Sequence, residues 1–151
     1  MQEVGRGRKQ DEVWQSLGPF LVKGDELTVQ YAFMERIEQL AQAALDRDHL
    51  KLRSFVQDVT REKVDWGNIQ HPSTNDARLL VVSAALVELL AQRNHQLPPA
   101  WTKEIGALKE PFFLLESAIQ MKRLRVLCET QSPEPMRKRL LYAPPHFLEF
   151  A

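Results

Sequence analysis

Basic side chains gather near the C-terminal end of the chain, and they are the strongest local feature that suggests a function. Residues 122–139 include six basic and two acidic side chains, which leaves a net charge of +4. The basic side chains are Lys122, Arg123, Arg125, Arg137, Lys138 and Arg139. Such a cluster attracts an acidic protein surface or the phosphates of a nucleic acid. The competing interpretation is a solvated helix end, with cations near the negative terminus of the helix dipole.

Aromatic side chains accompany this cluster in a proline-rich region that begins near residue 97. Aromatic residues and arginine are the usual anchors of protein interfaces. The candidate protein-binding residues are therefore Trp101, Phe112, Phe113, Arg123, Arg125, Arg137, Lys138, Arg139, Tyr142 and Phe147. The alternative is that the aromatic residues only hold an irregular tail against the core. No aromatic residue lies between 122 and 139, where a platform for stacking nucleic-acid bases would need one.

Arg139 and His146 are the one pair whose spacing suggests catalysis. Six residues separate them, which resembles the Arg–His motif of HEPN-type ribonucleases, a family that is also all-helical. That resemblance implies cleavage of RNA by the two side chains together. A loop histidine beside a basic helix is the other interpretation.

The remaining candidates for chemistry predict neither a metal site nor a nucleophile. The four histidines have no spacing of three or four residues, and zinc needs three or four converging ligands. Cys128 is the single cysteine, and we expect it to be buried and inert. No phosphate-binding glycine loop or serine-nucleophile motif is present. We therefore expect no cofactor, no metal and no enzyme activity.

Composition limits the class of protein further. The chain has 151 residues with 20 basic and 20 acidic side chains, and 44% of its residues are apolar. This predicts one globular domain and argues against a generally cationic nucleic-acid binder. The longest apolar run, Leu79 to Leu90, is too short to span a bilayer, and residues 1–11 hold no signal-peptide core. One cysteine is compatible with a reducing compartment, so we expect a cytoplasmic protein without membrane contact.

Hydrophobic periodicity predicts an all-α fold. Helices are expected over residues 25–45, with Asp25 as the N-cap, over 48–61 and over about 75–93. The third helix is apolar on almost every side, which is typical of a central helix that others cover. We expect a single domain of four to five helices around it, with residues 1–12 as a mobile arm.

Residues 97–151 are expected to form a proline-punctuated, irregular extension. Pro99 is expected to begin a short helical turn. Pro111 is expected to begin a longer helix that buries Leu114, Ala118, Met121 and Leu124. A short helix around 134–140 and an apolar tail complete the extension.

This extension also carries a pattern shared with other proteins. It has P-x-W, E-P followed by aromatic residues, L-R, and a P-x-x-M-R-K-R stretch before a final apolar F-L-x-x-A. It resembles the C-terminal part of a group of small, mostly uncharacterised bacterial proteins, in which Phe stands at the position of Met136 and Arg at that of Lys138. The matching residues are Trp101, Glu110, Pro111, Phe112 or Phe113, Leu124, Arg125, Pro133, Met136, Arg137, Lys138, Arg139, Phe147, Leu148 and Ala151.

The resemblance implies a partner protein. Proteins of this group are often encoded beside predicted nucleotidyltransferases, in pairs that look like toxin–antitoxin modules. The leading expectation is therefore a non-enzymatic, antitoxin-like protein whose partner is a nucleotidyltransferase-like toxin. A nucleic-acid-binding transcriptional regulator and a HEPN-like ribonuclease remain open as alternatives. The sequence gives no indication of the oligomeric state.

Overall fold

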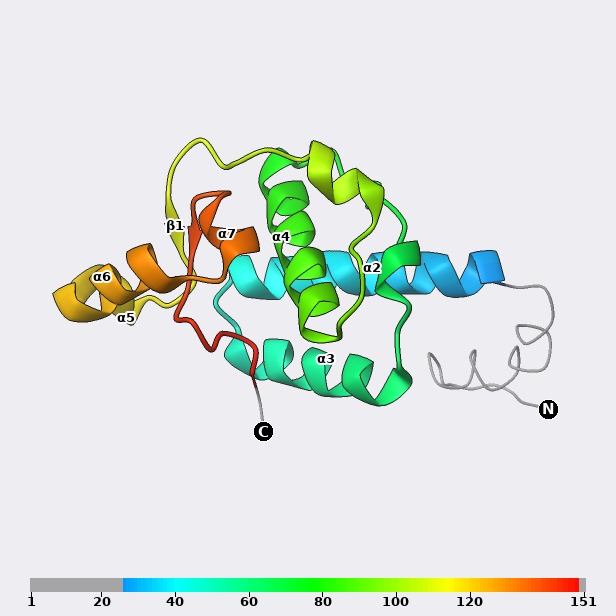
Figure 1. Ribbon diagram of the computed structural model, residues 1–151, viewed down its shortest axis with the longest axis horizontal. Helices are drawn as coiled ribbons and strands as arrows, with labels where there is room; N and C mark the ends of the chain where they lie inside the picture. The colour runs from blue at the N-terminus through cyan, green and yellow to red at the C-terminus, as the bar shows by residue number, and fades with distance from the viewer. Residues whose placement is uncertain (1–25, 150–151) are drawn as a thin grey trace, which may run out of the picture.

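The computed structural model describes residues 26–149, and within the first helix it describes side chains from Arg36 onward (Figure 1). The predicted mobile arm and the predicted cap Asp25 lie outside the described residues. Within them the chain forms six α-helices, two of which have four residues, two 3-10 turns and one pair of two-residue strands. The all-α class is therefore confirmed. No helix in this range is long and apolar enough to cross a membrane.

Two helices begin the described fold, α2 (Glu26–Leu45) and α3 (His49–Glu62). Asp48 ends the connection between them, and its carboxylate accepts a hydrogen bond of 3.2 Å from the backbone N–H of Lys51. This is the N-cap arrangement that satisfies a free donor in the first turn of a helix. The expected second helix is thus confirmed to within one residue at each end.

Helix α4 (Ala77–Arg93) is the most deeply buried element of the described chain. Its N-cap is Asp76, whose carboxylate accepts hydrogen bonds from the backbone N–H groups of Arg78 and Leu79. Eleven consecutive residues from Val81 to Ala91 are buried. The helix crosses α2 and also contacts α7 and two 3-10 turns, η1 (Trp66–Asn68) and η2 (Ala100–Glu104) (Figure 1). A helix covered from so many sides has no room for a polar face.

The prediction of one long helix beginning at Pro111 is wrong. The chain instead forms strand β1 (Phe112–Phe113), helix α5 (Ser117–Gln120) and helix α6 (Lys122–Gln131). β1 pairs in parallel with β2 (Leu141–Tyr142), with hydrogen bonds from the N–H of Phe112 to the carbonyl of Leu140 and from that of Leu114 to the carbonyl of Tyr142. Local periodicity carries no signal for a partner strand so far along the chain.

The C-terminal segment is tied to the body as expected for an apolar tail. The expected helix over 134–140 is shorter, α7 (Glu134–Arg137), and precedes β2. Arg93, at the end of α4, donates hydrogen bonds to the carbonyls of Pro145 and Phe147 and lies 3.5 Å from the carboxylate of Glu149. Phe147 and Leu148 are buried in the core. Residues 145–149 are therefore held at the end of α4.

Candidate protein-interaction surface

The aromatic residues of the predicted binding site make contacts within the protein itself. The indole Nε1 of Trp101 donates a 2.8 Å hydrogen bond to the carbonyl of Ile69, and its ring lies 5.1 Å from that of His71. The rings of Phe113 and Tyr142 lie 5.3 Å apart, where the two strands pair. These contacts support the alternative interpretation, in which the aromatic residues hold the extension against the core.

Phe112 and Phe147 also contact other parts of the chain. The ring of Phe112 is contacted by two guanidinium groups, with the carbon of Arg47 at 4.8 Å and that of Arg78 at 4.5 Å from its centroid. Arg47 also donates a 3.1 Å hydrogen bond to the carbonyl of Phe113. Cations over aromatic faces of this kind stabilise a fold by about 0.5–2 kcal/mol each. Phe147 is buried, and Phe112 is partly buried against the core.

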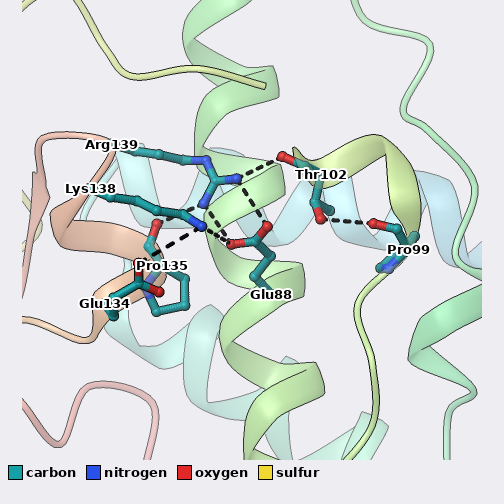
Figure 2. Close-up of polar contacts among 7 residues, drawn as sticks. All are labelled: Glu88, Pro99, Thr102, Glu134, Pro135, Lys138 and Arg139. Carbon is teal, nitrogen blue, oxygen red and sulfur yellow. Dashed lines mark hydrogen bonds and ion pairs between the residues drawn. The ribbon is translucent and has the colours of Figure 1, made fainter. Parts of the chain in front are cut away.

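Arg139 lies inside the protein rather than on the predicted basic face. Only 2% of its surface is exposed. Its guanidinium donates hydrogen bonds of 2.8 and 3.2 Å to the two carboxylate oxygens of Glu88 (Figure 2). It also donates to the carbonyls of Thr102 and Pro135, at 2.7 and 2.8 Å. The reason for its burial is Glu88, because a carboxylate inside an apolar helix requires a cation beside it.

The charge of Glu88 is neutralised from two sides. Burial alone would raise its pKa, but hydrogen bonds from Arg139 and Lys138 outweigh that cost and hold its pKa at about 2, compared with an ordinary value of 4.5. The Nζ of Lys138 lies 3.1 Å from Glu88 and 4.0 Å from Glu134. This buried ion-pair cluster joins α4, η2 and α7, and sequence reasoning did not find it. Its signal was the single acidic residue within the apolar run 79–90.

Arg139 and His146, the two residues that resemble the motif of HEPN-type ribonucleases, do not form an exposed pair. Arg139 is buried against Glu88, whereas the side chain of His146 is 82% exposed and lies 3.2 Å from Glu149. Cys128 is buried, and burial raises the pKa of its thiol, which disfavours the reactive thiolate. Among residues 26–149, no three His, Cys, Asp or Glu side chains gather to hold a metal ion.

The other four basic residues of the predicted cluster differ in their contacts; they are Lys122, Arg123, Arg125 and Arg137. Arg125 donates hydrogen bonds to the carbonyls of Ala118 and Ile119, so it closes the C-terminal end of α5. Arg137 donates a 2.9 Å hydrogen bond to the carbonyl of Thr130. Arg123 is exposed, as is its neighbour Lys122, and the side chain of neither forms a hydrogen bond or ion pair with any other described residue.

The exposed cations lie beside apolar side chains that sequence reasoning missed. Ile119, Met121 and Val126 are 46%, 58% and 47% exposed, and no other described part of the chain gathers three large apolar side chains at its surface. They belong to α5 and α6, which pack chiefly against each other and project from the body of the molecule (Figure 1). We call residues 117–131 the α5–α6 projection. The candidate surface on it consists of Ile119, Met121, Lys122, Arg123 and Val126.

The start of α6 breaks two rules of helix stability. Met121 holds the N-cap position, and no side chain caps the helix there. Lys122 and Arg123 occupy the first turn, at the positive end of the helix dipole, where cations are unfavourable. The interpretation of these two cations as a favourable charge at a C-terminal helix end is therefore wrong, although Arg137 does lie in the last turn of α7.

The projection is thus the part of the described chain where predicted basic residues lie beside exposed apolar side chains. Arg123, Arg125 and Arg137 lie on or beside it, whereas the aromatic residues and Arg139 support the core. No family model, curated protein or solved structure matches the chain.

Proposed function

We propose that this chain is a non-enzymatic, antitoxin-like bacterial protein that binds a cognate protein through its α5–α6 projection. The observation that carries the proposal is the exposure of Ile119, Met121 and Val126 within one short stretch of chain that also holds Lys122 and Arg123, whose side chains have no ion pair with any residue of 26–149. Single exposed apolar residues are common on protein surfaces, but a group of them rimmed by polar residues marks an interaction site. The body of the molecule holds this surface in place.

Different residues of the extension hold it in place and form the proposed binding surface, and this separation supports the proposed function. Arg139 fixes the extension to Glu88 of α4, and Trp101 fixes it to the carbonyl of Ile69, so neither is needed to contact another molecule. The sequence resemblance supplies the kind of partner, a nucleotidyltransferase-like toxin in the same cytoplasm. Neutralisation would then be steric, since binding needs no chemistry from this chain.

A nucleic-acid-binding regulator is the second candidate, and it rests on the exposed charges of Lys122 and Arg123, which form no ion pair within the described residues 26–149. Phosphate binding releases counterions and weakens steeply with salt. An apolar contact with a protein depends far less on salt. The chain as a whole carries no net charge, which favours the protein partner.

The test is purification of the tagged chain from its native host at moderate salt, with and without nuclease. The proposal predicts a protein partner in stoichiometric amount that survives nuclease treatment. Recovery of nucleic acid alone, or of the chain by itself, contradicts it. A partner with a nucleotidyltransferase fold would support the antitoxin assignment in particular.

A further inference from the structure

We infer that the α5–α6 projection receives an acidic amphipathic helix of the partner, whose carboxylates face Lys122 and Arg123. This inference rests on the proposed function, because it names the chemistry of the partner that the projection binds. Three features of the described residues carry it: the unpaired charges, the exposed apolar side chains in the same stretch of chain and the incomplete start of α6.

The charges require an acidic occupant. Lys122 and Arg123 have no ion pair within residues 26–149, and the projection as a whole carries three basic residues and one acidic residue. A basic segment would be repelled, whereas carboxylates placed here form charge-assisted hydrogen bonds. The same carboxylates would lie at the positive end of the α6 dipole, which has neither an acidic first turn nor a capping side chain.

The apolar side chains require an occupant with an apolar stripe. Val126 lies three residues after Arg123 and four after Lys122, so the three share one face of α6. The opposite face turns inward and buries Cys128. Ile119 and Met121, which come just before α6 in the chain, are exposed as well. A helix of ten residues is about 15 Å long, so a partner helix of about three turns, with apolar residues at spacings of three and four, would cover it.

Other occupants fit these features less well. A nucleic acid would pair with the two cations, but its phosphates gain nothing from Met121 and Val126, and the projection has no aromatic residue to stack on bases. A second copy of the chain that docked through the same surface would bring its own Lys122 and Arg123 against these cations. Both remain possible outcomes of the experiment and would overturn the inference.

The local sequence at Met121 also favours a role in binding. A Ser, Asp or Asn at this N-cap would stabilise α6, so Met121 leaves the helix less stable than a capping residue would. Positions that break local rules of stability are often functional sites. Replacing Met121 with an acid should therefore raise stability and lower binding at once, because the new carboxylate caps α6 and repels the acidic partner.

The first arm of the experiment maps the contact in the native host. A photo-crosslinking phenylalanine derivative is placed at Val126, or at Leu97 as the control, which is 84% exposed and lies outside the projection. The inference predicts a crosslink from position 126 to a protein segment that is acidic and carries apolar residues at helical spacing. A crosslink to nucleic acid, to another copy of this chain or to a basic segment overturns it.

The second arm measures affinity for the crosslinked partner segment made as a synthetic peptide. Met121→Asp should weaken binding at least tenfold and raise the melting temperature, whereas Leu97→Asp should leave the affinity unchanged. Equal affinities of the two variants contradict the inference. If position 126 crosslinks to the recovered partner protein but to a segment that is not acidic or has no apolar residues at helical spacing, the inference fails and the proposed function stands. If a partner protein is recovered and position 126 forms no crosslink with it, both fail. If no protein is recovered with any form of the chain, the proposed function fails as well.

Discussion

Glu88 and Arg139 lie 51 residues apart in the sequence, and their side chains are joined inside the protein by two hydrogen bonds of 2.8 and 3.2 Å. The pair connects the central helix α4 to the C-terminal extension. Arg139 belongs to the basic stretch that suggested a binding face, yet its position makes it part of the core. The stability of the extension therefore depends on this pair, and the proposed binding surface consists of other residues.

Removing one member of the pair should destabilise the protein strongly. Arg139→Met leaves Glu88 with Lys138 as its remaining charged partner, and Glu88→Leu leaves Arg139 buried without a carboxylate. Breaking a buried pair in this way costs about 3–5 kcal/mol in the free energy of unfolding. The double variant Glu88→Leu/Arg139→Met should recover most of that loss, because no buried charge then lacks a partner. Unfolding in urea measures all three.

The matched control is an exposed ion pair. Arg61→Met removes the partner of Asp58 at the surface of α3 and should change the free energy of unfolding by about 1 kcal/mol or less. A double variant whose loss equals the sum of the two single losses would show that Glu88 and Arg139 act independently, against the account given above.

The same carboxylate should make stability depend on acid pH. Its pKa is about 2 in the folded protein and 4.5 as an ordinary glutamate, so the folded state favours the charged form. A group whose pKa is lowered on folding contributes fully above its unfolded pKa and loses that contribution as the pH falls through the folded value. The stability difference between wild type and Glu88→Gln should therefore be constant from pH 7 to about 4.5 and should shrink toward pH 2. Urea titrations at these pH values test it, and a difference that stays constant down to pH 2.5 would refute it.

Trp101 should matter for stability and not for partner binding. Trp101→Phe keeps the apolar ring but removes the hydrogen bond to the carbonyl of Ile69, which should cost about 0.5–1.5 kcal/mol in the free energy of unfolding. Binding of the partner, measured well below the unfolding temperature, should be unchanged. If binding is lost at unchanged stability, Trp101 contacts the partner directly, as the sequence first suggested.

Cys128 should report on whether the projection opens from the body. Its thiol is buried on the inner face of α6, and burial raises its pKa. A thiol-specific colorimetric reagent should therefore modify it far more slowly in the native protein than in urea. Rapid modification without denaturant would mean that α6 separates from the body under native conditions.

The sequence was informative where a local pattern settled the structure. The apolar run of α4 and the cap of α3 at Asp48 are local signals, and those helices were predicted to within about two residues. The region after Pro111 was not predictable in this way. Its structure depends on the pairing of Phe112 with Leu141, a contact between segments far apart in sequence. Periodicity describes one segment at a time and cannot reveal such a contact.

The candidate site was likewise predictable only in part. That the region 122–139 is basic could be read directly, but which of its cations face solvent depends on partners elsewhere. Arg139 is buried because Glu88 lies on another helix, and Arg125 turns back to the carbonyls of α5. Met121 was expected on the buried side of a continuous helix, and it is exposed because the helix is broken at that residue. The lone acid in the apolar run was the one signal that could have indicated a buried cation.

The most direct test of the central claim is the affinity of the purified partner for two variants with the same charge change. Lys122→Glu/Arg123→Glu reverses the two cations of the projection, and Lys103→Glu/Lys109→Glu reverses two exposed lysines that lie outside it. Isothermal titration at physiological salt should show at least a tenfold weaker affinity for the first variant and an unchanged affinity for the second. Equal affinities of both variants, with both correctly folded, would contradict the claim that the protein binds its partner through the α5–α6 projection.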